Sequence, residues 1–346
     1  MKTSKLPLVS VVVIGRNEGD RLLDCLESVN SVPREGFRLE LIYVDSASSD
    51  GSPDRARAHG ARVIEVNPER PSAALGRNAG WRSSKGEFVL FLDGDTLLDP
   101  GFIAKALPAM DEPGVAVVWG HRRERFPEQS LYIRVLDLDW IYPPGDSEFC
   151  GGDALMRREA LEHVAGFDDT LIAGEEPELC RRLREQHNRV LHMDIPMTLH
   201  DLGIDSFSAY WRRALRAGHA YAEVAHRYRN SPDPLWHNDS RRNLLKGLLL
   251  LASPVRLVLA FSVSPGLAFG LCIAAAAMIA RSAHRGRWKS PDRTDRWLYA
   301  IHSHFQQIPI LFGQLTWRLH RWKGENRRLI EYKQADGIHC EEASSP

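Results

Sequence analysis

Four mainly apolar runs lie in the first hundred positions, and segments with helical periodicity separate them. The runs are residues 9–14, 39–44, 61–66 and 88–92. The last is apolar at every position, which is typical of a strand that is covered on both faces of a parallel sheet. Between the first two runs, Leu22, Leu26 and Val29 recur at helical spacing. The pattern from residue 8 to residue 92 therefore predicts an α/β fold with a doubly wound, mainly parallel sheet.

Acidic side chains follow three of these predicted strands. Glu18 follows the first run, Asp45 ends the second, and Asp93-Gly94-Asp95 follows the fourth. The carboxyl ends of parallel strands meet at one edge of a sheet, where ligands bind in this class of fold. Two close carboxylates suit a divalent cation that also binds phosphate oxygens. The alternatives are an ordinary Asp-Gly turn at residues 93–95 and a simple strand-end cap at Asp45.

The same loops lack the signatures of two common phosphate-binding sites. The first predicted strand is followed by Gly-Arg-Asn-Glu-Gly, which is neither GxGxxG nor GxxxxGK[ST]. A dinucleotide cradle and a P-loop are therefore both unsupported.

The middle of the chain predicts further strands and a substrate-facing region. Residues 101–110 are expected to form a helix, residues 115–119 and 190–195 strands, residues 121–148 an irregular region and residues 150–156 a short strand. The start of the irregular region carries an arginine cluster, formed by Arg122, Arg123 and Arg125. Gly151 and Gly152 would let a ligand approach the backbone closely.

A second pair of carboxylates precedes a predicted helix. Glu175 and Glu176 stand just before Pro177, which suits the first turn of a helix. There the helix dipole favours the carboxylate form, so these residues either only complement the dipole or take part in chemistry.

Together these blocks resemble the family 2 glycosyltransferases, which are inverting enzymes of the GT-A fold. The resemblance covers about residues 8–200, and six ordered blocks carry it: VSVVVIGRNEGDRLLDCLESV, LIYVDSASSDGS, GRNAG, FLDGDT, GGDALMRREAL and GFDDTLIAGEEPELCRRLR. It implies transfer of a sugar from a nucleotide-sugar donor, with a UDP-sugar expected, to a hydroxyl of a polysaccharide or lipid-linked acceptor. It also implies a mixed, mainly parallel sheet.

The resemblance assigns roles to residues of the donor site. Asp95 should contact a divalent cation, Mn²⁺ or Mg²⁺, and Asp93 the cation or the ribose. His200 is a candidate third ligand, because a neutral imidazole binds such metals; the alternative is a hydrogen-bonded loop histidine. The expected nucleotide-sugar-binding residues are Glu18, Asp45, Arg77, Asp93, Gly151 and Gly152. Among these, Asp45 would contact the base, Glu18 the base or ribose, and Arg77 the pyrophosphate.

The catalytic base is assigned by the same resemblance. Glu176 stands where the family usually has the Asp of a Glu-Asp pair, and the choice between Glu176 and Glu175 stays open. On the acceptor side, Trp211 and Arg212 loosely resemble the acceptor-binding segment of processive relatives, although the order of residues differs.

The C-terminal part is expected to associate with a membrane. Residues 257–280 contain no charged residue over 24 positions, which is enough to cross a bilayer. Residues 244–255 are also apolar, and both flanks are basic, which favours a hairpin around Ser264-Pro265-Gly266 or an in-plane insertion over a single span. The alternative is a pair of buried helices. Trp317 and Trp322, within residues 314–328, suggest an amphipathic segment at the interface.

Composition adds limits on location and partners. Lys plus Arg and Asp plus Glu both number 45, so no charge excess points to nucleic acid. The five cysteines include no CxxC pair, and residues 1–7 contain no signal-peptide core. We therefore expect the cytoplasmic face of the cell membrane. The expected divisions are a catalytic domain over residues 1–205, a helical acceptor-side linker over 206–243, membrane-associated helices over 244–282, and an amphipathic helix and tail over 283–346.

Two other functions fit parts of the sequence. The first is a catalytically inactive membrane scaffold that keeps the fold. The second takes FLDGDT as the nucleophile strand of a haloacid-dehalogenase-type phosphatase, although Leu97 stands where that motif has Thr or Val, and the strand is fourth in the chain instead of first.

Overall fold

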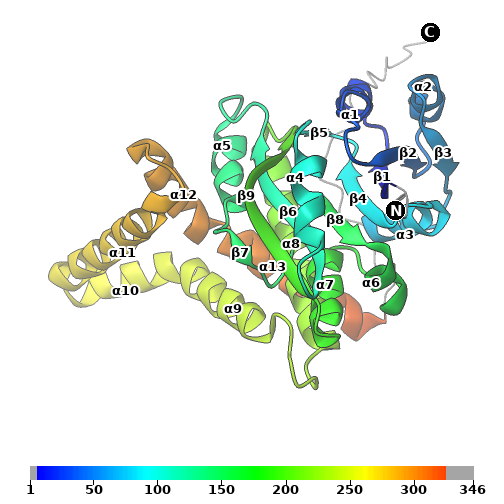
Figure 1. Ribbon diagram of the computed structural model, residues 1–346. Helices are drawn as coiled ribbons and strands as arrows, with labels where there is room; N and C mark the ends of the chain where they lie inside the picture. Colours follow the sequence, from blue (N-terminus) through cyan, green and yellow to red (C-terminus); the bar gives the residue numbers. More distant parts are fainter. Residues whose placement is uncertain (1–5, 325–346) are drawn as a thin grey trace, which may run out of the picture.

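A mixed sheet organises the first two hundred residues of the computed structural model, which describes residues 6–324 (Figure 1). Its strand order in this described part is β3-β2-β1-β4-β8-β6-β9-β5, and β7 pairs with β9. The strands are β1 Leu8–Gly15, β2 Arg38–Asp45, β3 Arg62–Glu65, β4 Phe88–Asp93, β5 Thr96–Leu98, β6 Val115–Glu124, β7 Gly145–Asp146, β8 Ala154–Arg157 and β9 Arg189–His200.

The predicted parallel half of the sheet is confirmed. Strands β3, β2, β1 and β4 pair in parallel, whereas β8 pairs antiparallel with β4. Their registers align Gly15 with Asp45 and Ile14 with Asp93, so the carboxyl ends of β1, β2 and β4 share one edge. Uninterrupted apolar runs made this half predictable, because both faces of these strands are buried.

Helices cover the sheet in the usual α/β manner. They are α1 Asp20–Asn30, α2 Ser52–Ala58, α3 Ala73–Ser83, α4 Phe102–Met110, α5 Leu131–Asp137, α6 Arg158–His163 and α7 Glu175–Glu185, with a 3₁₀ turn at Leu138–Trp140. Helix α3 lies directly against β1: a Cβ at Gly80 would stand only 2.2 Å from Cγ1 of Val12. This close packing holds Arg77, one turn earlier on α3, at the carboxyl edge of the sheet.

Three predicted boundaries are wrong. Strand β6 continues to Glu124, so residues 121–124 belong to the sheet instead of an irregular region. Strand β9 runs on through Pro196 to His200, because its last residues pair with β5. Strand β8 begins at Ala154, and residues 150–153 form a loop.

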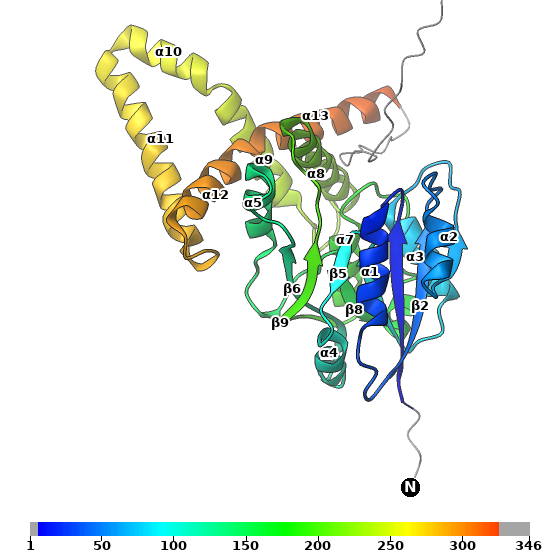
Figure 2. The same ribbon diagram turned by 90° about the horizontal axis from the view of Figure 1, so that it is seen from above.

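Six helices follow the sheet in the described chain. They are α8 Phe207–Arg227, α9 His237–Leu251, α10 Ser253–Val263, α11 Pro265–Arg285, α12 Arg293–Phe305 and α13 Gln307–Lys323, with a 3₁₀ turn at Gly286–Trp288. Helices α10 and α11 fold back on each other at Ser264, and both views show this hairpin extending away from the domain (Figures 1 and 2). Helix α13 returns to pack on α8, where Gly313 and Gly218 permit backbone contact.

The extended hairpin is apolar and exposed. Phe261 and Val263 on α10 and Phe269 on α11 are 65%, 79% and 68% exposed. The helix Pro265–Trp288 is long and apolar enough to cross a membrane, and α9 with α10 passes the same test only as one span bent by 48°.

The prediction that Trp317 lies at a membrane interface is wrong, because this side chain is buried beside His226. Trp322 is exposed, and residues 325–328 of the predicted amphipathic segment lie outside the described residues.

Candidate functional site

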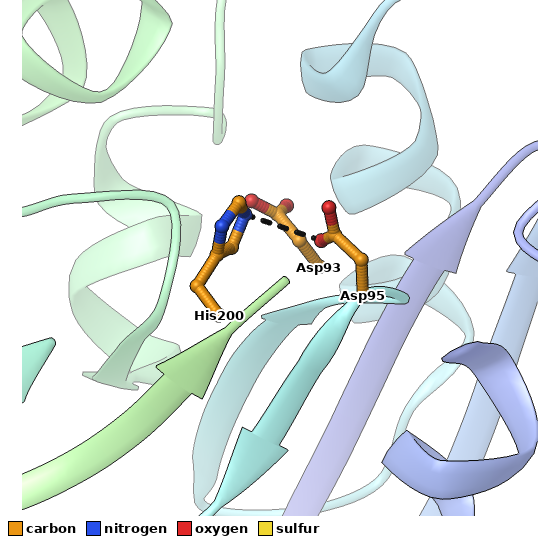
Figure 3. A group of neighbouring side chains, drawn as sticks. All are labelled: Asp93, Asp95 and His200. Atoms are coloured by element: carbon orange, nitrogen blue, oxygen red, sulfur yellow. Dashed lines mark ion pairs between the residues drawn. The ribbon is translucent and has the colours of Figure 1, made fainter. Parts of the chain in front are cut away.

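Two carboxylates and an imidazole meet at the carboxyl edge of the sheet. Asp93 ends β4, Asp95 lies two residues on, and His200 ends β9. Antiparallel pairing of Thr96 with His200 brings the imidazole beside Asp95, with Nε2 3.3 Å from Oδ1. One ligand atom from each of the three residues lies within 4.8 Å of the others (Figure 3). Carboxylate oxygens and an imidazole nitrogen form a donor set that fits a divalent cation such as Mn²⁺.

Surrounding charges hold His200 in this group. Burial lowers the pKa of His200, but the carboxylates around it, Asp95 foremost, outweigh this effect and raise the pKa above its usual value. On the other side of the ring, Nδ1 lies 3.3 Å from Oε1 of Glu124. A carboxylate on the second nitrogen is the usual way to orient a metal-binding histidine. Glu124 therefore has the position of an orienting group, which the sequence reading missed.

Arg77 links the acidic turn to the second carboxylate pair. Its guanidinium is 2% exposed, with Nη2 2.9 Å from Oδ1 of Asp93 and Nη1 3.0 Å from Oε1 of Glu175. The same Nη1 lies 3.1 Å from Oε1 of Glu176. A buried arginine needs such partners, because an unpaired buried charge costs several kcal/mol. Arg77 thus fixes the distance between α7 and the group formed by Asp93, Asp95 and His200, which is called the cation group below.

The surroundings of Glu176 bring its pKa close to neutral pH. It lies in the first turn of α7, after Gly174 in the left-handed conformation. Burial, and then the negative charge of Glu175, raise the pKa of Glu176 to about 7, against the opposing effect of Arg77. A carboxylate with a pKa near the working pH can take a proton from a hydroxyl more readily than an ordinary one.

Two adjoining cavities meet at Glu176. The larger, of about 700 Å³, is lined by the loop after β1, by the start of α3 and by Asp93. The smaller, of about 330 Å³, is lined mainly by aromatic side chains and by residues 150–153. Glu176 and Arg213 line both. The arrangement places one carboxylate between a space bordered by the cation group and a space that can hold a second molecule.

Comparison with known proteins gives the family. Residues 10–165 match the family described as glycosyl transferase family 2. The chain is 30% identical over 189 residues to glycosyltransferase AglE of Haloferax volcanii. The matched region covers 52% of this chain and 62% of AglE. It is 27% identical over 238 residues to the pre-mycofactocin glycosyltransferase of Mycobacterium tuberculosis. This match covers 66% of this chain and 49% of that protein. Residues 10–165 are a family 2 glycosyltransferase domain.

A solved structure supports the fold over nearly the whole chain. Mannosyltransferase PcManGT from Pyrobaculum calidifontis matches with a TM-score of 0.67 at 20% identity, over 93% of this chain and 89% of that one. The predicted GT-A fold is confirmed, and the likeness reaches into the C-terminal helices. The phosphatase alternative is wrong, because FLDGDT lies inside the matched family region. The chain spans about half to 62% of the length of the curated relatives named above.

The glycosyltransferase domain brings most of the predicted residues to the cavities. Glu18, Arg77, Asp93, Glu175 and Glu176 line the larger one, and Gly151 and Gly152 the smaller one. Asp45 lines neither: it is 2% exposed, its Oδ1 accepts a hydrogen bond from Tyr43 at 2.9 Å, and its Oδ2 accepts one from the backbone of Ser48 at 2.8 Å. Its contact with a nucleotide base stays a prediction.

The predicted acceptor residues lie elsewhere on α8. Trp211 packs in an aromatic cluster with Phe305 and Phe312, and neither Trp211 nor Arg212 lines either of these two cavities. Arg213, the next residue, lines both cavities. Which residue of this turn faces the cavities depends on how α8 packs, and the acceptor contacts of Trp211 and Arg212 stay a prediction.

Asp153 was missed as a site residue, and Arg122 was predicted only as part of an arginine cluster in the substrate-facing region. Asp153 accepts a hydrogen bond from the backbone N–H of Asp93 at 3.1 Å and another from Thr198 at 2.9 Å. Arg122 lies between Asp93 Oδ2, at 3.6 Å, and Asp153 Oδ2, at 3.5 Å. The alternation of β6 could have revealed this, since Arg122 and Glu124 share a face and Arg123 points to Asp137 on the other.

Replacing Gly152 by Ala should impair the site without unfolding the domain. A Cβ at this position would stand 2.6 Å from Nη2 of Arg77 and 3.0 Å from Oδ2 of Asp93. Since those atoms carry the link between the two carboxylate pairs, we expect donor turnover to fall by about a hundredfold. Gly151→Ala is the matched control, because its Cβ would meet only Arg122 Nη1, at an ordinary 3.5 Å. Equal turnover in both variants, measured as nucleoside diphosphate release, would contradict this expectation.

Proposed function

We propose that the chain is an inverting glycosyltransferase that moves a sugar from a nucleotide-sugar donor to a hydroxyl of a polysaccharide or lipid-linked acceptor, with a divalent cation. The observation that carries this proposal is the position of Glu176 at the junction of two cavities, one of which is lined by Asp93 of the Asp93, Asp95 and His200 group. PcManGT, the structural neighbour, is described in complex with GDP-Man and Mn²⁺. That complex supports a nucleotide-sugar donor for the larger cavity.

The side chains of the larger cavity suit a nucleoside diphosphate. Asp93, Asp95 and His200 would hold the cation, which when bound neutralises the charge that grows on the leaving diphosphate. Arg16, Arg21 and Arg213 line the cavity and add positive charge around the phosphates. Glu18 and Ser46 border the same space and would meet the nucleoside.

Transfer then needs one displacement. Glu176 takes the proton of the acceptor hydroxyl, whose oxygen bonds to the anomeric carbon from the face opposite the leaving group. The bond from that carbon to the diphosphate oxygen breaks, and the nucleoside diphosphate leaves with both bonding electrons. Attack from the opposite face inverts the anomeric configuration. Arg77 keeps Glu176 in place during this step, because its Nη1 lies 3.1 Å from Oε1 of Glu176.

The rate should rise with pH through about 7. Because the pKa of Glu176 is raised to about 7, the carboxyl is largely protonated below that pH and cannot accept a proton. We expect kcat/KM for transfer to increase about tenfold per pH unit below 7 and to level off above it. A profile that is flat across this pH would contradict the assignment of Glu176 as base.

A donor screen tests the function itself. Full-length protein in detergent is incubated with UDP-glucose, UDP-galactose, UDP-GlcNAc, GDP-mannose and dTDP-rhamnose, with Mn²⁺ or with a chelator, and nucleoside diphosphate release is measured. We expect release from one nucleotide class that depends on the cation. Absence of nucleoside diphosphate release from every donor, with or without the cation, would instead favour the inactive scaffold.

We also propose that the α10–α11 hairpin attaches the enzyme to the cytoplasmic face of a membrane. Its apolar side chains are exposed, and basic residues stand on both sides of it: Arg241, Arg242 and Lys246 before, and Arg281, Arg285, Arg287 and Lys289 after. A hairpin keeps both basic flanks on the same side. Full-length protein should sediment with membranes, and Phe261→Glu with Phe269→Glu should release it. Recovery of the unaltered chain in the soluble fraction without detergent would contradict this.

A further inference from the structure

Trp236 has a backbone conformation that few bulky residues adopt. It precedes α9 with φ 58° and ψ 12°, in the left-handed region. Large side chains rarely occupy this region, and such strain gathers at binding sites. The ring is only partly buried, so burial in a core does not account for the strained position.

The ring of Trp236 lies beside the helix that carries the base. A Cβ at Gly174 would stand 2.9 Å from Cζ3 of Trp236, and Gly174 immediately precedes α7. On another side, the ring of Tyr221 supports it at 4.6 Å between centroids. Trp236 and Glu176 both line the smaller cavity. The strained residue therefore presents an aromatic surface within the space next to the carboxylate.

The smaller cavity combines aromatic walls with balanced charge. Its aromatic side chains are Trp119, Trp140, Tyr142, Phe149 and Trp236. Arg122 is paired with Asp93 and Asp153, and Arg213, which lines both cavities, serves the phosphates of the donor in the proposed function. Apolar faces with a few polar groups bind the C–H faces of a sugar ring, whereas a phosphate needs cations that are not already paired. A volume of about 330 Å³ is near the lower limit for ligand sites, which suits one sugar unit.

We propose that the smaller cavity binds the terminal sugar of the acceptor, with its ring stacked on Trp236, so that the enzyme extends an existing glycan. This rests on the proposed transferase function and adds the class of acceptor. An ionised phosphate acceptor needs no base, whereas a sugar hydroxyl does, and Glu176 stands at the border of this cavity. Stacking on Trp236 would hold that hydroxyl toward Glu176.

The test measures sugar binding apart from turnover. Full-length protein in detergent micelles is mixed with methyl glycosides of glucose, galactose, mannose and N-acetylglucosamine, and saturation-transfer difference NMR reports contact with the sugar ring protons. We expect signals from at least one glycoside in the unaltered protein. Trp236→Ala should weaken binding about tenfold, and Trp236→Phe should retain most of it. Trp322→Ala is the control, since Trp322 is 83% exposed and lines neither cavity.

Donor hydrolysis by water, with thermal unfolding, separates the possible failures. If Trp236→Ala hydrolyses the donor and unfolds as the unaltered protein does while losing glycoside signals, the stacking role is supported. Undiminished signals in Trp236→Ala overturn it. No glycoside signal in an unaltered protein that hydrolyses its donor also overturns it, and this outcome would point to a phosphate acceptor. Failure of donor hydrolysis in the unaltered protein counts against the proposed function instead.

Discussion

Glu176→Gln should lose sugar transfer by about a thousandfold while it retains donor binding. General-base catalysis typically contributes about 10²–10⁴-fold, and an amide cannot take up the proton. The change is nearly isosteric, and the amide oxygen can still accept the contact from Arg77 that now reaches Oε1 at 3.1 Å. Transfer is measured as product formation, and binding by calorimetric titration with the nucleoside diphosphate.

Glu175→Gln is the matched control for this variant. Glu175 lies one residue earlier and contacts the same guanidinium at 3.0 Å, but it lines only the larger cavity. We therefore expect a much smaller loss than in Glu176→Gln. The reverse order of the two losses would move the base to Glu175, the choice that the sequence left open.

Asp95→Asn should weaken cation binding by at least about a hundredfold. Asp95 is buried and lies 3.3 Å from His200, so its charge cannot be replaced by a solvent-exposed carboxylate. Loss of a group that only orients a ligand typically lowers metal affinity about 10–100-fold. Loss of a ligand should lower the affinity further. Mn²⁺ binding is followed by electron paramagnetic resonance, which needs no turnover.

Asp99→Asn controls for the loss of one negative charge nearby. The Asp99 carboxylate accepts a hydrogen bond from the backbone of Gly101 at 2.9 Å and is not part of the cation group. We expect the Asp99→Asn variant to bind Mn²⁺ with the same affinity as the unaltered protein. Equal affinity in Asp95→Asn would remove Asp95 from the cation site.

The parallel half of the sheet and its acidic edge were predictable because both depend on local sequence. Strands β1 and β4 are marked by apolar runs, and the turn at Asp93 follows directly after such a run. Their position in the fold then follows from the general geometry of parallel sheets. The resemblance supplied the proposed role of Glu176 as base, which no local pattern assigns.

The remaining site residues depend on contacts between distant segments. Glu124 and His200 meet because β6 and β9 pair beyond the points where their apolar patterns end. Trp236 reaches the cavity through the packing of α8 and α9, and its left-handed backbone leaves no mark in the sequence. Arg213 instead of Arg212 faces the site because tertiary packing sets the rotation of α8. None of these follows from residue spacing alone.

The most direct test of the central claim is the configuration of the sugar that the enzyme releases. UDP-glucose and GDP-mannose are α-linked donors, and whichever one the enzyme hydrolyses is followed by proton NMR before the free sugar mutarotates. If Glu176 deprotonates the incoming water or hydroxyl for direct displacement, the β-anomer appears first. Initial release of the α-anomer would mean retention of configuration and would contradict the account.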